Sequence, residues 1–401
     1  MADIIKPGSK PILKLAKPIS KEKIKKSKRL RLKRILQTSL PIIGLVFLML
    51  LGNYLILTNQ SYDGIRTTSV YARNSSEANR YEPFANGIVR YNRDSVVFLN
   101  RRNREQWIQL SQMANPMFTA SADVFVVADQ GGNGIKVFTI LGLKGSFETP
   151  FPIERIAVSN QGIVSAILRN DENPMIATYD ATGNLLVENQ IPLRTMGYPT
   201  ALALSKDGTM LAVGYLSING GVIRSRVVYY NFAHPDPAVV DFVVVNDEYE
   251  DYIVVDIHFL EDDISVVITD RAFMIYQGNV NPTLQHHISM EREIKSVFYG
   301  RNHVGFVLMD VAQGGNEVRL YNQSGEMVLN RNFEGDYGNV LMIDDDIIMY
   351  DNMSVFIMSR WGIIRYQGFL DINPLLVMPA FGVNRYYIVG SNELRIINLV
   401  R

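Results

Sequence analysis

The chain has 401 residues, of which 47% are hydrophobic, and it contains no cysteine. The absence of cysteine excludes a disulfide framework, a cysteine nucleophile and thiolate metal sites. The formal net charge is zero, but residues 1–34 carry thirteen Lys and Arg against Asp3 and Glu22, a net of +11, so the other 367 residues carry −11. Such an asymmetry predicts that the two parts of the chain face different compartments.

Residues 1–34 are predicted to form a disordered tail, because they combine a high net charge with three prolines. A basic cluster occupies the second half of this tail. Its members are Lys21, Lys23, Lys25, Lys26, Lys28, Arg29, Arg31, Lys33 and Arg34. The cluster favours a cytoplasmic location by the positive-inside rule, and contact with anionic lipid headgroups. Binding of an acidic protein or of nucleic acid is the less favoured interpretation, and we expect no nucleic-acid partner.

Residues 35–58 are predicted to be a transmembrane helix. The uncharged run Leu36–Leu57 has 22 residues, which at a rise of about 1.5 Å each extend over roughly 33 Å and suffice for a bilayer core of about 30 Å. A cleaved signal peptide is the main alternative, but no small-residue cleavage site follows. We therefore expect an uncleaved signal anchor, a single-pass protein of the cell membrane, and an extracytoplasmic C-terminal domain.

The remainder is predicted to be a polar stalk at residues 59–86 followed by an all-β ectodomain at 87–401. In the ectodomain an apolar strand recurs about every 42 residues, as is typical of four-stranded propeller blades. These strands are SVVFL from Ser95, VFVVA from Val124, IVSAIL from Ile163, MLAVGYL from Met210, ISVVIT from Ile264, VGFVLM from Val304, DIIMY from Asp346 and YYIVG from Tyr386. The series predicts an eight-bladed β-propeller, with seven blades or two stacked β-sandwiches as alternatives.

Turn residues support the same architecture. Lys206-Asp207-Gly208 predicts a tight turn before the strand at Met210, and Gly183 and Gly325 predict turns into outer strands. The last unit ends at Leu399, one strand short of a complete blade. A strand at residues 65–71 of the stalk could complete this blade and close the ring.

Three segments carry a family resemblance: ALALSKDGTMLAVGYLSINGGVIRSRVVYYNF, IKSVFYGRNHVGFVLMD and VRLYNQSGEMV. With them the chain, from about residue 30 onwards, resembles an uncharacterised family of bacterial single-pass membrane proteins. That family has a basic N-terminus, one membrane helix and a WD-type or Tol-type propeller-like ectodomain. The resemblance implies an envelope location in a Firmicutes-type cell, and it implies no catalytic residues.

The sequence contains no recognised metal or cofactor motif. The five histidines lack the spacing of a zinc site, and the pair His286-His287 is expected in a solvated loop between blades. Three acidic clusters, at residues 246–251, 261–263 and 344–346, are expected at turns rather than around calcium. We therefore expect no metal and no cofactor.

Four carboxylates recur at the ends of the apolar strands of different units: Asp129, Asp270, Asp310 and Asp351. Convergence of these side chains in the propeller funnel would indicate an envelope enzyme that cleaves glycan or peptide. Strand ends also take Asp for turn reasons alone, so a non-enzymatic interaction scaffold is the favoured hypothesis. Its partner would be an envelope protein or polymer at the loop faces. A single-pass envelope sensor is the third hypothesis.

Overall fold

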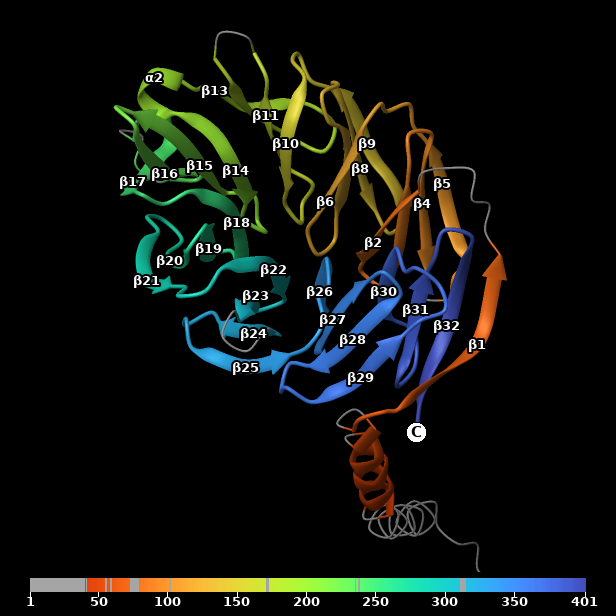
Figure 1. The fold of residues 1–401 in the computed structure, drawn as a ribbon. Helices are drawn as coiled ribbons and strands as arrows, with labels where there is room; N and C mark the ends of the chain where they lie inside the picture. The colour runs from red at the N-terminus through yellow and green to blue at the C-terminus, as the bar shows by residue number, and fades with distance from the viewer. Residues whose placement is uncertain are drawn as a thin grey trace, which may run out of the picture. The chain divides into compact units, whose positions relative to one another are not determined.

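The computed structural model describes residues 40, 42–54, 56–57, 60–72, 79–100, 102–170, 173–234, 236, 239–310 and 315–401 (Figure 1). The chain divides into two compact units, Met1–Thr58 and Asn59–Arg401. In the first unit, residues 42–54 form a helix. Among the described residues, none of the helices is both long and apolar enough to span a membrane. The tail at 1–34, with its whole basic cluster, and part of the predicted span at 35–58 lie outside the described residues, so both remain predictions.

The second unit is an eight-bladed β-propeller in which each described blade is a four-stranded antiparallel sheet (Figure 1). The first four blades, with strands in sequence order, are as follows: blade 1 has β2(Arg80–Phe84), β3(Gly87–Tyr91), β4(Ser95–Asn100) and β5(Glu105–Leu110); blade 2 has β6(Pro116–Ala120), β7(Phe125–Asp129), β8(Gly134–Thr139) and β9(Gly142–Glu148); blade 3 has β10(Ile153–Val158), β11(Val164–Leu168), β12(Met175–Tyr179) and β13(Leu185–Gln190); blade 4 has β14(Tyr198–Leu204), β15(Met210–Asn219), β16(Val222–Asn231) and β17(Val243–Glu250). Two short helices, α2(Leu193–Met196) and η1(Val240–Phe242), lie in the loops beside blade 4.

The other four blades follow the same order, except that the last takes its fourth strand from the N-terminal end. Blade 5 has β18(Val254–Glu261), β19(Ile264–Thr269), β20(Ala272–Gln277) and β21(Thr283–Ser289); blade 6 has β22(Ile294–Gly300), β23(His303–Asp310), β24(Gly315–Asn322) and β25(Met327–Phe333); blade 7 has β26(Asn339–Ile343), β27(Asp346–Asp351), β28(Ser354–Ser359) and β29(Ile364–Phe369); blade 8 has β30(Leu376–Pro379), β31(Arg385–Val389), β32(Glu393–Val400) and β1(Gly64–Ala72).

The hydrophobic core lies between blades rather than inside any one of them. Second and third strands are apolar on both faces, as in the fully buried VSAIL of β11, because each sheet is covered by two neighbours. Eight buried clusters each join two consecutive blades, and one of them joins blade 8 to blade 1 through Tyr387 and Ile88. The ring is therefore closed with eight blades, and the seven-blade and β-sandwich alternatives are wrong.

The ring closes through β1, which pairs antiparallel with β32 from Gly64↔Val400 to Ala72↔Glu393. The stalk segment 65–71 lies within this strand. The chain is also fixed just before it, because the Tyr62 amide donates to the Arg365 carbonyl at 2.8 Å and Ser61 Oγ donates to the Ile364 carbonyl at 2.8 Å. Closure thus joins the two ends of the unit across an edge that would otherwise be exposed.

We call the face at which residues 60–63 join blade 8 the N-terminal face. The Leu399 amide, near the end of β32, donates to the Asn384 carbonyl at 2.9 Å, so the turn between the first and second strands of blade 8 lies at this face. Because all strands are antiparallel, turns between first and second strands and between third and fourth strands share it. Turns between second and third strands lie at the opposite face.

The propeller begins earlier than the boundary at residue 87 that the sequence suggested. Strand β2, RYEPF, lies inside the segment expected to be stalk, and it pairs with β3 as the first strand of blade 1. It escaped notice because only Tyr81 and Phe84 are buried and Pro83 interrupts the pattern. The tight turn predicted at Lys206-Asp207-Gly208 is present, with Gly208 at φ +76° and its amide bound to the Ser205 carbonyl.

Candidate functional site

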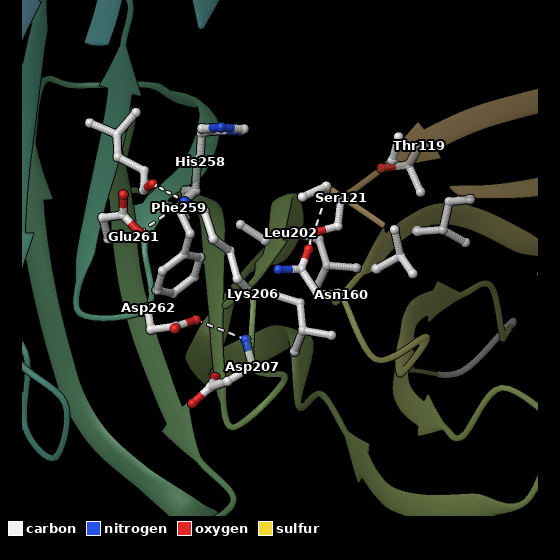
Figure 2. Close-up of a pocket in the computed structure, with 18 of the residues that line it drawn as sticks. Thr119, Ser121, Asn160, Leu202, Lys206, Asp207, His258, Phe259, Glu261 and Asp262 are labelled. Atoms are coloured by element: carbon white, nitrogen blue, oxygen red, sulfur yellow. Dashed lines mark hydrogen bonds and ion pairs between the residues drawn. The ribbon is translucent and has the colours of Figure 1, made fainter. Parts of the chain in front are cut away.

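A cavity of about 980 Å³ is lined by first strands of blades 2 to 6 and by the turns that follow them (Figure 2). First strands line the centre of the ring because each later strand of a blade lies farther out. The cavity therefore occupies the central opening on the N-terminal face. We call it the central cavity.

Polar links between neighbouring blades surround this cavity. Asn160, in the first turn of blade 3, accepts from the Ala122 amide of blade 2 at 2.9 Å and also binds Ser121 Oγ. The Asn160 amide in turn donates to the carbonyl of Lys206 in blade 4 at 2.8 Å. The first turns of consecutive blades are thus hydrogen-bonded to one another, so these polar groups are not left open to a ligand.

Blade 4 binds blade 5 in the same manner (Figure 2). The Lys206 ammonium lies 3.0 Å from Glu261 Oε2 and also donates to the Leu260 carbonyl. Beside it, the Asp207 amide donates to Asp262 Oδ1 at 2.8 Å. Lys206, Glu261 and Asp262 are therefore engaged as joints between blades.

Strand β18 places two titratable side chains on the cavity wall. Tyr299 of blade 6 donates to Asp256 Oδ2 at 2.6 Å, and the His258 ring stacks on the Tyr299 ring at 4.1 Å between centroids. Burial raises the pKa of Asp256 above its usual value, although the bond from Tyr299 opposes this. Burial, assisted by the nearby Lys206 charge, lowers the pKa of His258 to about 4, so His258 is neutral at pH 7.

Arg155 is an exposed cation of the cavity wall, which also includes exposed Arg301. Arg155 lines the central cavity and a second cavity of about 470 Å³ that also contacts Tyr198 and Arg169. Within the part of the chain that the structure describes, its guanidinium makes no hydrogen bond and no ion pair. The Arg155 charge does act on Asp256, whose pKa it lowers against the larger effect of burial. Arg155 is thus available to an anionic group that enters the cavity.

On blade 1, Glu82 is a titratable group in the first strand. Burial raises its pKa to about 6, against the opposing attraction of the Arg80 charge. Glu82 does not line the central cavity. It and His258 therefore titrate in separate surroundings.

Two of the four carboxylates proposed from the sequence accept a hydrogen bond from the backbone of their own blade, and a third lies beside it. Asp129 Oδ1 accepts from the Asn115 amide at 2.7 Å, and Asp270 Oδ1 accepts from the Ile253 amide at 3.0 Å. Asp351 lies beside Gly338, where an added Cβ would meet its Oδ2 at 3.4 Å. In each blade the contacted residue immediately precedes the first strand.

The recurrence of these aspartates therefore has a structural cause, since Asp129 and Asp270 each hold the start of the first strand at the opposite face and Asp351 lies at the equivalent place. The fourth member, Asp310, ends β23 and pairs with Gly315 across the equivalent turn. The four belong to blades 2, 5, 6 and 7. Across the described residues, no three His, Cys, Asp or Glu side chains are placed to hold a metal ion.

Two sequence expectations about polar clusters are wrong. His286 and His287 lie in the outer strand β21 and are exposed, rather than in a loop, because an outer strand needs few apolar residues. The acidic segment at 246–251 lies mostly in β17, another outer strand, where Asp247 accepts from Tyr276 OH at 2.7 Å. The clusters at 261–263 and 344–346 do include turns.

The sequence analysis missed the residues that line the cavity. Strand β18 reads VVDIHFLE, and its polar residues Asp256 and His258 lie two apart within an apolar run. That spacing places both on one face of a strand and could have indicated a polar channel. Which face points inwards depends on ring closure, which the local pattern does not contain.

Solved structures with a similar fold include a eukaryotic initiation factor, at 12% identity and a TM-score of 0.52, covering 82% of this chain and 87% of that one. BamB from Moraxella catarrhalis has 13% identity and a TM-score of 0.47, covering 84% of this chain and 100% of that one. The Pan2 WD40 domain of Neurospora crassa has 8% identity and a TM-score of 0.43, with coverage of 84% and 96%.

These likenesses concern the fold alone, and no curated protein matches the chain. A family model described as a family of unknown function, DUF5711, matches residues 58–399, which include every strand of the propeller except the end of the last. The chain belongs to the DUF5711 family.

Proposed function

We propose that this protein is a membrane-anchored, extracytoplasmic β-propeller that acts as a non-enzymatic interaction scaffold in the envelope of a Firmicutes-type bacterium. The uncharged run Leu36–Leu57 and the basic cluster before it support the anchor and its orientation. A closed ring supports the scaffold, because it presents rigid turns on two faces and leaves no blade unpaired.

The observation that carries the proposal is that the charged side chains lining the central cavity are mostly bound to neighbouring blades. Lys206 binds Glu261, Asp262 binds the Asp207 amide, and Asp256 accepts from Tyr299. Each of these contacts crosses between blades. Groups that are already committed to holding the ring together are poorly placed for bond cleavage, so the turns at the surface are the better candidates for function.

The partner fits an envelope protein or polymer. Residues 35–401 carry a net charge of −11, which favours a partner with basic groups and disfavours nucleic acid. The opposite face, whose turns lie farthest from the joined N-terminal segment, is the best platform for such a partner. Ser391, in the exposed turn between β31 and β32, marks this face.

Crosslinking in intact cells tests the proposal. The natural chain has no cysteine, so Ser391→Cys introduces a unique attachment point for a thiol-specific photocrosslinker. Gln285→Cys on the exposed outer strand β21 is the matched site, and residues 1–58 fused to an unrelated ectodomain are the control. We expect envelope proteins to be captured reproducibly from Ser391→Cys. Capture that does not exceed the control at either site would contradict a protein scaffold.

An envelope enzyme acting on glycan or peptide is the second candidate, favoured by one observation. Asp256 and His258 face a cavity of about 980 Å³ together with the unpaired guanidinium of Arg155. Assays of the full chain against cell-wall glycan and peptide fragments test this candidate. If the protein turns over such a fragment, and Asp256→Asn abolishes this turnover while His234→Gln does not change it, the enzyme hypothesis replaces the scaffold hypothesis.

A further inference from the structure

The N-terminal face carries exposed apolar side chains at the tips of turns in neighbouring blades. Leu141, in the turn between β8 and β9 of blade 2, is 89% exposed, and Ile140 beside it is also exposed. In blade 8, Phe381 is 63% exposed in the turn between β30 and β31, next to exposed Val383. In blade 7, Trp361 is 56% exposed. Single exposed apolar residues are ordinary, but these all lie on one face, in blades 7, 8 and 2.

Arginines accompany these apolar tips. Arg102 and Arg104 are exposed around the turn of blade 1, between the apolar tips of blades 8 and 2. The Arg360 guanidinium lies over the Trp361 ring, 4.7 Å from its centroid, and also pairs with Asp345 at 3.0 Å. Arg401 follows the last strand. We call this set the basic-apolar rim: Ile140, Leu141, Trp361, Phe381, Val383, Arg102, Arg104, Arg360 and Arg401.

The first turns of blades 4 and 5, on the same face, are mainly acidic. Blades 4 and 5 place Asp207, Asp262 and Asp263 in their first turns, and in the described residues of these turns only Lys206 opposes them. Acidic groups also occur near the rim, at Asp63, Asp123, Asp344 and Asp345, of which Asp345 is paired with Arg360. Exposed Val280 of blade 5 and Arg301 of blade 6 also lie in turns of this face, but its most exposed apolar turn residues, Leu141, Phe381 and Trp361, lie in blades 2, 8 and 7.

The chain joins the propeller in the middle of this rim. Gln60 accepts from Arg401 at 2.6 Å, and the Tyr62 amide is bound to blade 7. Only two residues separate the end of the uncharged run, at Leu57, from Gln60 in the sequence. The segment 60–63, where the chain enters the propeller, thus lies on the same side of the N-terminal face as the basic-apolar rim.

We propose that the basic-apolar rim rests on the anionic headgroup layer of the bilayer, so that the propeller lies on the membrane in a fixed orientation. Tryptophan, phenylalanine and arginine are the side chains that suit this layer, where the ring is half-immersed and the cation meets phosphate. A protein partner would be expected to use a continuous surface, whereas these apolar side chains protrude singly from separate turns. The inference rests on the proposed membrane anchor.

Depth-dependent quenching in the full chain tests the inference. Val383→Cys and Ser391→Cys lie in the same blade on opposite faces, and in a cysteine-free chain each takes a single fluorescent label. Each labelled protein is reconstituted into vesicles of phosphatidylcholine and phosphatidylglycerol that contain a lipid with a nitroxide on its headgroup. We expect quenching at least threefold stronger at Val383→Cys than at Ser391→Cys.

A pair of matched substitutions separates a specific contact from simple proximity. Phe381→Ser combined with Leu141→Ser removes apolar tips from the rim, whereas Phe369→Ser removes a Phe that is 80% exposed on the opposite face of blade 7. The first change should reduce quenching at Val383→Cys at least twofold, and the second should leave it unchanged. Replacing phosphatidylglycerol by phosphatidylcholine should also reduce it.

Flotation of the same vesicles distinguishes the two possible failures. Protein that floats with the vesicles but is quenched equally at both labels would overturn the rim contact and leave the anchor intact. Protein that does not float at all would overturn the anchor, and the rim contact with it.

Discussion

Two charged pairs lie at joints between neighbouring blades, and they differ mainly in burial. Within blade 7, the Arg365 guanidinium of β29 binds both oxygens of Asp346 in β27 at 2.8 Å, with exposed side-chain fractions of 7% and 12%, and hydrogen bonds from this pair reach Tyr386 and Asn384 of blade 8. Between blades 4 and 5, Lys206 binds Glu261 at 3.0 Å, with exposed fractions of 27% and 40%. The pairs have the same formal charges but opposite access to solvent.

The buried pair is also part of a larger network. Tyr386 of blade 8 donates to Asp346 at 2.6 Å and accepts from Arg365 at 2.8 Å, while Asn384 binds both Arg365 and Tyr62. A charge that is held away from water cannot be resolvated when its partner is lost, whereas an exposed one can. The stability of the joint between blades 7 and 8 should therefore depend on each residue of this network. The stability of the joint between blades 4 and 5 should depend little on its ion pair.

The largest effect is expected for Arg365→Met, which leaves the Asp346 carboxylate buried without its partner. We expect a loss of about 3–5 kcal/mol in the free energy of unfolding, measured for the full chain by urea denaturation. Arg331→Met, an exposed arginine in β25, is the matched control and should stay within about 0.5 kcal/mol of the natural chain. Equal losses for the two variants would show that burial does not distinguish these arginines.

The next effect concerns pH and the joint between blades 4 and 5. The pKa of His258 is about 4 in the folded protein, against 6.5 in an unfolded chain. Between these values the unfolded chain binds a proton that the folded protein does not, so stability falls as the pH decreases from about 6.5 to 4. We expect His258 to contribute roughly 1–3 kcal/mol of this loss, because cavity water reaches part of the ring.

Urea denaturation of the full chain at several pH values checks this dependence. His258→Gln should flatten the slope between pH 6.5 and 4, and His234→Gln, which alters a histidine outside the cavity, should not. A slope unchanged by His258→Gln would mean that another group controls the acid sensitivity of the fold.

Much of this ring can be predicted from its repeat, because each blade needs one strand buried on both faces. MLAVGYL and ISVVIT are such strands, and their spacing indicates the number of blades. Strand β1 could also be predicted, since a ring that lacks one strand must take it from the other end of the chain. Strand β2 could not, because Glu82 and Pro83 give it no apolar alternation and its place is fixed by β3.

The site was harder to predict because its contacts join residues far apart in the sequence. Lys206 and Glu261 are 55 residues apart, and Asn160 meets Ala122 across 38. The positions of Asp129 and Asp270 recur in the sequence, but their role depends on amides 14 and 17 residues away. A periodic carboxylate therefore indicates a repeated place in the fold and does not by itself indicate a shared site.

A smaller effect is expected at the hydroxyl that connects the N-terminal segment to the buried network. Tyr62 OH accepts from Asn384 and from Gln60 Nε2, the latter at 2.6 Å. Tyr62→Phe keeps the aromatic side chain but removes both hydrogen bonds, so we expect a loss of about 1 kcal/mol in the free energy of unfolding. Tyr71→Phe, which removes the hydroxyl of a tyrosine that is 40% exposed in β1, is the matched control. A loss as large as that of Arg365→Met would mean that the N-terminal segment, rather than the pair of Arg365 and Asp346, stabilises the joint between blades 7 and 8.

The smallest effect is expected for Lys206→Met, the counterpart of Arg365→Met at the joint between blades 4 and 5. Methionine keeps most of the length and the apolar stem of lysine, and the Glu261 carboxylate that loses its partner can be hydrated because 40% of its side chain is exposed. We therefore expect a loss of about 0–1 kcal/mol, which decreases as salt screens the pair in the natural chain. Urea denaturation at low and high ionic strength measures both features. A loss of several kcal/mol that does not respond to salt would mean that the bond from Lys206 to the Leu260 carbonyl, rather than the ion pair, joins these blades.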